Sequence, residues 1–325
     1  LKRMQRTLVA KLSFVFLSSA IFALIFSTTL THLSLVTFLK AWFGMLIVIV
    51  LGLFVRDFGR GKELGEEEGL HYKFQNIGLL VGPLLGGFLA AQASYEIVFL
   101  LASVTLIIGL VYFIHKHIIE NHPAIIDRKY AKEYSFIKNF KQFFRDSGRA
   151  KAYLITFALM SWSAFKNLYI PLYIVISTYK DSMSGLILSL MILPLILLEV
   201  KVGKYADKHG FRIPISAGFL IISLFLIIIF LCPYPVINFL IFIIINIGKA
   251  LVEPLQESYL FKHLPPEEED NLYGIYMTAD TLAFFMTPLI GALILFFLPF
   301  EFLFLVFGVL FGLVSYFTWL KLQHS

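Results

Sequence analysis

Cysteine is nearly absent from this chain of 325 residues, in which Cys232 is the only one. A single cysteine excludes an intramolecular disulfide framework and a cysteine-rich metal site. The sequence also lacks the HExxH, CxxC, P-loop and GxSxG strings that mark common catalytic sites, and its histidines form no group. We therefore expect neither an enzyme nor an ATP-driven pump, and we expect no cofactor and no bound metal.

Charge is scarce as well. Asp, Glu, Lys and Arg make up 15% of the residues, whereas soluble domains average about 25%. Hydrophobic residues make up 59%, and a helix needs roughly 17–25 apolar residues to cross a bilayer. No run shows the period-2 alternation of a membrane barrel strand. The sequence predicts an all-α membrane protein with ten transmembrane helices, at residues 7–29, 33–56, 72–93, 97–116, 152–176, 184–203, 213–232, 235–254, 272–298 and 301–321.

The basic residues indicate how the chain is oriented. Nearly all of the 27 Lys and Arg residues lie at the chain ends or in the gaps 57–71, 117–151, 204–212 and 255–271, and Lys180 is the exception assigned to the opposite side. The positive-inside rule then predicts a multi-pass protein of the cell (plasma or inner) membrane with both termini in the cytoplasm. The net charge of +6 has the same origin, so we expect contact with the lipid bilayer and no binding to nucleic acid.

The longest gap divides the chain into domains. We predict an N-terminal bundle of four transmembrane helices at 1–116, a cytoplasmic linker at 117–151 and a C-terminal bundle of six at 152–325. Within the linker, Tyr134–Arg145 places Phe and Ile at near-helical spacing with Lys and Arg between them. This pattern favours an amphipathic helix in the lipid headgroup layer. A plain solvated linker is the alternative.

A charged turn joins the predicted spans 184–203 and 213–232. Its sequence is Gly203-Lys-Tyr-Ala-Asp207-Lys-His-Gly210-Phe-Arg212, and this GxxADxxGxR pattern is similar to the cytoplasmic loop signature of the major facilitator superfamily of secondary transporters. The resemblance implies two bundles around a pseudo-two-fold axis, with a cavity between them and transport by alternating access. A solvated loop that happens to be charged is the alternative.

The resemblance extends over the whole chain. Counted back from the C-terminus, the six spans after residue 151 match the second half of the family's twelve-helix fold, and the four before it match helices three to six. The chain therefore resembles an N-terminally truncated member that lacks the first two helices. The alternative is a natural ten-helix protein that starts at Met4. We expect a monomer in either case.

A second motif lies in the predicted span 72–93. Its sequence, Gly78-Leu-Leu-Val-Gly82-Pro83-Leu-Leu-Gly86-Gly87, resembles the GxxxGPxxGG signature of the family's fifth helix, which is associated chiefly with antiporters, drug/proton exporters among them. Glycines four residues apart allow another helix to approach closely, and proline bends its helix. The motif therefore favours a hinge, and a merely structural helix crossing is the alternative.

Polar residues inside the predicted spans are the candidates for binding substrate or proton, because each is costly in a membrane unless it faces a cavity or a partner. Lys166 suits an anionic substrate or a titrating role, and Asp280 is the best candidate for carrying a proton, unless it pairs with Lys249. Lys40 stands where the family usually has Arg, which weakens its case. Helix packing and snorkelling are the alternatives for the whole set, which is Lys40, Gln75, Asn76, Lys166, Asn167 and Asp280.

The signature loop carries a prediction of its own. In the family its acidic residue faces the N-terminal end of a helix in the other half, so the resemblance implies that Asp207 lies near Gly69–Tyr72. Unpaired N–H groups and the helix dipole attract a carboxylate there. Gly203 and Gly210 would permit close approach and a tight bend, and Arg212 would hold the turn through carboxylates or carbonyls.

An alternative is that Asp207 pairs with Lys204 or Lys208 in its own loop. The run Glu66–Glu68 favours this alternative, because it brings like charges to the same helix start.

Taken together, the motifs predict a secondary active transporter, proton-coupled or driven by another ion, that exports small, partly hydrophobic molecules. A transport-inactive fragment, or a membrane protein that serves only binding or assembly, is the alternative.

Overall fold

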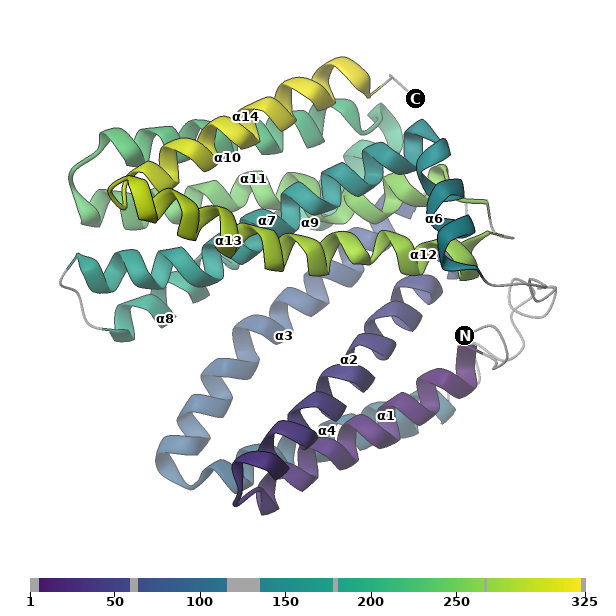
Figure 1. Ribbon diagram of the computed structural model, residues 1–325. Helices are drawn as coiled ribbons and strands as arrows, with labels where there is room; N and C mark the ends of the chain where they lie inside the picture. The colour runs from purple at the N-terminus through teal and green to yellow at the C-terminus, as the bar shows by residue number, and fades with distance from the viewer. Residues whose placement is uncertain (1–5, 59–63, 116–134, 178–180, 266–267, 323–325) are drawn as a thin grey trace. The chain divides into compact units, whose positions relative to one another are not determined.

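The computed structural model describes residues 6–58, 64–115, 135–177, 181–265 and 268–322, and the regular secondary structure of these residues is entirely helical (Figure 1). Every predicted span falls on one helix or on two consecutive helices. The bounds are α1 Arg6–Ala23, η1 (a 3-10 helix) Leu24–Phe26, α2 Leu30–Phe58, α3 Leu64–Gln92, α4 Tyr95–His115, α6 Phe136–Arg145, α7 Ser147–Ile176, α8 Asp181–Leu190, α9 Leu193–His209, α10 Arg212–Leu231, α11 Pro235–Lys262, α12 Glu269–Tyr276, α13 Thr278–Phe297 and α14 Phe302–Lys321.

Eight helical stretches among the described residues are long and apolar enough to cross a membrane. They are α1 with η1, α2, α4, α9 with the end of α8, α10, α11, α13 with most of α12, and α14. The prediction of an all-α membrane protein is therefore confirmed. The count of ten spans stays a prediction, because α3 and α7, which are 29 and 30 residues long, are not among the eight.

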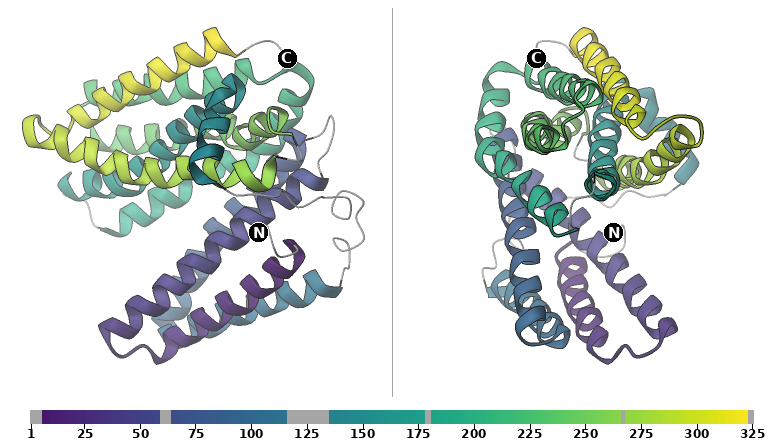
Figure 2. Two further views of the ribbon diagram at one scale, coloured as in Figure 1. Left: turned by 45° about the vertical axis from the view of Figure 1, so that its right-hand side comes forward. Right: turned by 90° about the vertical axis from the view of Figure 1, so that its left-hand side faces the viewer.

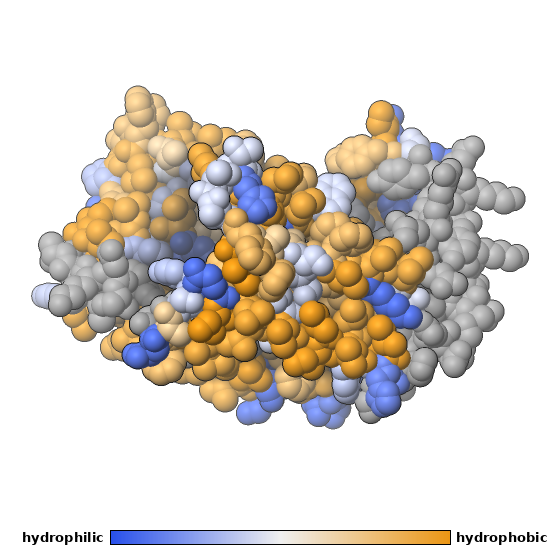
Figure 3. Space-filling model, turned by 90° about the horizontal axis from the view of Figure 1, so that it is seen from below, coloured by the Kyte–Doolittle hydropathy of each residue, from blue (hydrophilic) through white to orange (hydrophobic). Residues whose placement is uncertain are grey.

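The outer surfaces of these helices are largely apolar. Large hydrophobic side chains are exposed on nearly every helix, for example Trp42 of α2 and Phe296 of α13. Figure 3 shows hydrophobic residues over much of one face of the molecule. Exposed apolar surface of this extent is unfavourable in water and suits contact with lipid tails.

Two of the predicted spans are interrupted. The run 184–203 is divided into α8 and α9, and Pro194 occupies the first turn of α9, where its missing N–H costs nothing. The run 272–298 is likewise divided into α12 and α13 at Met277. Hydropathy alone does not reveal these breaks, because both halves of each run are apolar.

Two helices extend further into charged sequence than predicted. Helix α3 begins at Leu64 instead of residue 72, and α11 ends at Lys262 instead of residue 254. The added turns are charged but they are not solvated, since Glu68 on α3 and Glu257 on α11 are both buried. These extensions place carboxylates inside the helical bundle.

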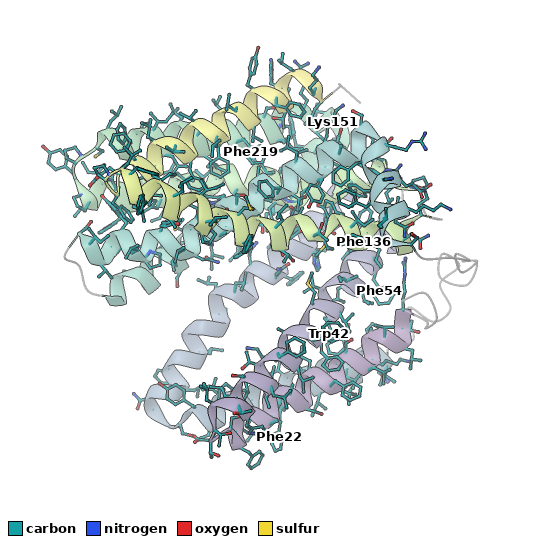
Figure 4. The ribbon with its side chains drawn as sticks, viewed as in Figure 1. Phe22, Trp42, Phe54, Phe136, Lys151 and Phe219 are labelled. Atoms are coloured by element: carbon teal, nitrogen blue, oxygen red, sulfur yellow. The ribbon has the colours of Figure 1, made fainter. Side chains whose placement is uncertain are left out.

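The described residues form two compact units. Unit 1 contains α1, α2, α4 and the part of α3 from Val81, and α1 packs against both α2 and α4. A small apolar core joins α1 to α2 through Val9, Ala10, Val50 and Phe54, the last of which is labelled in Figure 4. The Ser18 hydroxyl donates to the backbone carbonyl of Ser103 at 3.0 Å, which fixes α1 against α4.

Unit 2 contains the part of α3 up to Leu80 and every helix from α6 onward. Helix α10 packs along α14 and α11, and α7 packs along α13, as the views of Figures 1 and 2 show. Aromatic rings fill the interior, among them the fully buried Trp162, Phe165 and Phe219. The predicted domains 1–116 and 152–325 remain a prediction, because the contacts group the beginning of α3 with the later helices.

Part of the predicted linker 117–151 is helical. Helix α6 buries Phe143 and Asn139 and exposes Phe136, Ile137 and Phe140. It is attached to α12 through Glu268, which accepts hydrogen bonds from Gln142 at 2.9 Å and from Arg149 at the start of α7. Residues 117–134 of this linker lie outside the described residues.

Candidate functional site

Helices α3 and α9 approach each other backbone to backbone. A methyl group at Gly69 of α3 would lie 2.6 Å from the carbonyl oxygen of Glu199, and one at Gly203 of α9 would overlap the carbonyl of Gly65. Only glycine leaves room for such an approach. The close approach predicted for Gly203 is present, and its partner on α3 is Gly65, while Gly69, one turn further along α3, lies against Glu199 and Val200.

Asp207 lies at the N-terminus of α3. The N–H of Gly65 donates to its Oδ1 at 2.9 Å, and the N–H of Glu66 donates to its Oδ2 at 2.9 Å. A carboxylate in this position satisfies two of the orphan donors of the first turn and interacts with the positive end of the helix dipole. The predicted partner region Gly69–Tyr72 is wrong by one to two turns, because α3 begins earlier than hydropathy indicates.

The acidic run at the start of α3 does not prevent this contact. Lys204 of α9 forms an ion pair with Glu66 at 2.8 Å, and both side chains are partly exposed. Glu68, by contrast, is fully buried. The loop lysine therefore neutralises part of the acidic run, so that Asp207 bonds to the α3 backbone.

The end of α9 turns sharply. Gly210 has φ 86° and ψ 172°, a region that residues with a Cβ rarely adopt. This geometry agrees with the tight bend predicted for Gly210. The guanidinium of Arg212 lies 4.3 Å from the centre of the Trp319 ring, so a cation–π contact with α14 helps to hold the turn, a partner that the sequence analysis did not name.

A charged stripe runs along α11. Lys249, Glu253 and Glu257 follow one another at intervals of four residues, which places them on one helix face, and all three are buried. The Lys249 ammonium and Glu253 Oε1 are 3.0 Å apart. Charges buried in this way must be paired and hydrogen-bonded, since a buried unpaired charge is strongly destabilising.

A second carboxylate meets this stripe from α9. Glu199 is fully buried, and its Oε1 accepts a hydrogen bond from the amide of Asn76 on α3 at 2.8 Å. The carboxyl of Glu253 is also within hydrogen-bonding reach of Glu199. We call the four residues Asn76, Glu199, Lys249 and Glu253 the buried polar cluster.

A tyrosine-lined group lies one turn further along α11. Glu257 accepts hydrogen bonds from the hydroxyls of Tyr72 at 3.2 Å and Tyr273 at 3.0 Å. The amide of Gln256 donates to the Tyr72 hydroxyl at 3.0 Å. Helix α3 thus donates hydrogen bonds to carboxylates at three successive levels along its length. Its start donates to Asp207, Tyr72 donates to Glu257, and Asn76 donates to Glu199.

The predicted polar candidates have different surroundings. Asn76 belongs to the buried polar cluster, and Lys166 on α7 lies close enough that the charges of Lys249 and Glu253 act on it. Gln75 and Asn167 are exposed, and Lys40 is a partly exposed residue of unit 1.

Asp280 lies in the first turn of α13, and its Oδ1 is buried without a hydrogen-bond partner among the described residues. The partner suggested for it, Lys249, is paired with Glu253. Asp280 therefore does not serve as the counter-ion of Lys249.

The glycine-rich motif of α3 has open surroundings. Within the described part of the chain, no atom lies within 4 Å of a methyl group placed at Gly78 or Gly82, and one at Gly86 would lie 3.6 Å from Val98. Pro83 and Gly87 fall inside the same continuous helix. Among the residues that the structure describes, the close helix approach expected for this motif is therefore absent at Gly78 and Gly82, and in α3 it occurs at Gly65 and Gly69.

Sequence reasoning missed five buried carboxylates, which are Glu68, Glu199, Glu253, Glu257 and Glu269. Glu199 and Glu253 lie inside the predicted spans 184–203 and 235–254. The criterion that makes Asp280 a candidate, an ionisable side chain inside a span, therefore applies to them as well. Glu68 and Glu257 were assigned to charged loops, because the spans were ended at the first cluster of charges. Only the tertiary contacts reveal that those clusters are buried.

Comparison with known proteins decides the family. The family model described as Major Facilitator Superfamily matches residues 1–278 and 168–325. This chain belongs to the major facilitator superfamily. It is therefore a multi-pass membrane transporter, as the loop signature at Gly203–Arg212 indicated. That family membership was predicted from the residues and is confirmed.

Other members share the fold at low identity. An uncharacterized MFS-type transporter, MJ1560 of Methanocaldococcus jannaschii, is 22% identical over 265 residues, which is 80% of this chain and 67% of that protein. The crystal structure of the human organic anion transporter MFSD10 (TETRAN) superposes with a TM-score of 0.81 at 16% identity, over 98% of this chain and 78% of that one. The Escherichia coli fucose:proton symporter FucP superposes with a TM-score of 0.80 at 12% identity, over 99% and 85%.

Proposed function

We propose that this superfamily member is a proton-coupled exporter that exchanges a small, partly hydrophobic molecule for protons by alternating access. The observation that carries the proposal is the buried polar cluster. Ionisable residues inside apolar helices are expensive and commonly form proton relays or substrate paths. In the cluster, two carboxylates and a lysine meet where α3, α9 and α11 converge in unit 2.

The contacts of α3 supply a gate. Asp207, Glu257 and Glu199 each accept a hydrogen bond from α3, and opening this side of the transporter requires all three levels to separate. A carboxylate at a helix start contributes about 0.3–1 kcal/mol, and up to ~2 kcal/mol when partly buried. Contacts of this size bias a two-state equilibrium without freezing it, which alternating access needs.

The direction of transport and the substrate class are proposed from a sequence motif, from structural relatives and from Lys166. The motif Gly78–Gly87 resembles the antiporter signature and favours export. One structural relative is described as a proton symporter and another as an organic anion transporter, which supports proton coupling and leaves both directions and an anionic substrate open to test. Lys166, near the buried polar cluster, is the residue we assign to an anionic group of a substrate.

The setting of the transporter follows the sequence predictions. We propose a monomer with ten spans in the cell membrane and with both termini in the cytoplasm. The end of the bundle that carries Asp207 and Lys204 then faces the cytoplasm, because the basic loops lie there.

The experiment uses the chain reconstituted in liposomes with an acidic lumen. Ethidium and sulforhodamine B serve as a cationic and an anionic probe, and retained probe is measured after filtration. We expect at least one probe to accumulate, and accumulation should stop when an ionophore removes the pH gradient. Accumulation that matches protein-free liposomes for a well-folded protein would favour the inactive or binding-only alternative.

A further inference from the structure

We infer that Glu199 and Glu253 form a carboxyl pair that shares a single proton, and that this pair is the proton-binding site of the transporter. The second half of this statement rests on the proposed function, whereas the first half concerns the folded protein alone. Neither residue was a candidate from the sequence, where Asp280 was preferred.

The first line of evidence is a pair of oxygens without donors. Glu199 Oε2 and Glu253 Oε2 are both buried, and neither has a hydrogen-bond partner among the described residues. The other oxygen of each is used, Glu199 Oε1 by Asn76 and Glu253 Oε1 by Lys249. The two carboxyls lie within hydrogen-bonding reach of each other.

Two ionised carboxylates cannot bond to each other. An ionised carboxylate only accepts hydrogen bonds, while a protonated one carries an O–H donor. A contact between Glu199 and Glu253 therefore requires one proton on the pair, and that proton is located where each carboxyl has an oxygen to spare. Like-charge pairs in proteins hold a shared proton for the same reason.

The charges around the pair support the same count. Lys249 of α11 is 3.0 Å from Glu253, Asn76 of α3 is neutral, and Lys166 of α7 acts on the cluster from further away. With one proton, Glu199, Glu253 and Lys249 have no net charge. Without that proton, the same three residues carry one excess negative charge in an apolar interior, which is energetically costly.

Loss of the proton would also change the helix packing. It places two negative charges side by side, one on α9 and one on α11, and these repel each other. Because Glu199 and Asp207 are both on α9, a displacement of α9 loosens the first and third levels of the α3 contact. The pair therefore connects proton release to the gate.

Infrared spectroscopy tests the shared proton without any substrate. Protein in lipid at pH 7 is compared with Glu199→Gln, Glu253→Gln and the double variant by the C=O stretching band of protonated carboxyl groups. Each single variant should lose the same one-proton band, because the remaining carboxylate pairs with Lys249. The double variant should lose no more than either single one.

Two further variants keep the test decisive if a glutamine variant folds poorly. Glu253→Asp retains a carboxyl and should retain the band. Lys249→Met removes the balancing charge and should add a second protonated carboxyl, roughly doubling the band of the pair. Glu301→Gln removes an exposed carboxyl at the start of α14 and serves as the matched control, with no change expected.

Several outcomes would overturn the inference. The protonated-carboxyl band could remain unchanged in both single variants, or it could be lost in only one of them. The double variant could also lose two separate bands, one for each carboxyl. Failure of the proposed function is distinguishable, since a protein without coupled transport would still show the shared band. Intact coupled transport without the band would reject the pair alone.

Discussion

Asp207 of α9 accepts the backbone N–H of Gly65 at 2.9 Å, across 142 positions of the chain. The loop signature of the superfamily and the first turn of α3 thus form one contact. It is possible because Gly65, Gly69 and Gly203 remove the side chains that would keep the two backbones apart. The contact between α9 and α3 therefore depends both on the carboxylate of Asp207 and on the glycines that let the two backbones approach.

The first prediction concerns the strength of this contact. Asp207→Asn keeps the size of the side chain but removes its charge, and we expect α3 to separate about two- to fivefold more often, which corresponds to the 0.3–1 kcal/mol of a helix-start carboxylate. The measurement is the maleimide labelling rate of a cysteine placed at the fully buried Glu68, after Cys232→Ser.

The matched control is Lys208→Gln in the same loop. It should leave the labelling rate unchanged, because Lys208 is exposed and Asp207 bonds to the backbone of α3. A rise with Lys208→Gln and none with Asp207→Asn would show that the loop pairs internally.

The second prediction concerns the glycines. Gly69→Ala and Gly203→Ala force backbone atoms apart and should destabilise the closed arrangement by about 1–3 kcal/mol, as overpacking does. Gly78→Ala is the control on the same helix, since nothing lies within 4 Å of it among the described residues. It should be neutral or stabilise by up to ~1 kcal/mol.

The readout is the thermal unfolding midpoint in detergent. We expect Gly69→Ala and Gly203→Ala to lower the midpoint and Gly78→Ala to leave it equal or higher. Equal midpoints for all three alanine variants would contradict close backbone packing between α3 and α9.

The third prediction concerns Gly210, whose φ of 86° is unfavourable for any other residue. Gly210→Ala should cost about 1–3 kcal/mol through backbone strain. Gly274→Ala in α12, which has open space around it, is the comparison. A fall in the unfolding midpoint for Gly274→Ala alone would count against the turn geometry at the end of α9.

The sequence predicts the membrane fold well and the site less well. Long apolar runs determine the helices, and the loop signature at Gly203–Arg212 indicated the family before any contact was known. The helix ends were missed where charge is buried, as at Glu68 and Glu257, because burial depends on partners from other helices. The break before Pro194 was missed because both sides of it are apolar.

The preference for Asp280 shows the same limit. Position inside a span made it a candidate, but the sequence contains no information on which carboxylates face each other. Glu199 and Glu253 lie 54 positions apart in the sequence and meet only when α9 packs against α11. The arrangement of the proposed proton site therefore depends on the tertiary packing of α9 and α11.

The fourth prediction compares these carboxylates directly. In liposomes with an acidic lumen, Glu253→Gln should abolish probe accumulation while exchange of probe at equal pH persists, because exchange needs no net proton movement. Asp280→Asn should slow accumulation without abolishing it, and Glu301→Gln should match the unaltered protein.

That accumulation, measured side by side for Glu253→Gln and Asp280→Asn, is the most direct test of proton coupling through the carboxyl pair. The account predicts that only Glu253→Gln loses accumulation driven by the pH gradient while it retains exchange. Unchanged accumulation in Glu253→Gln, or its complete loss in Asp280→Asn alone, would contradict the account and move the proton site to α13.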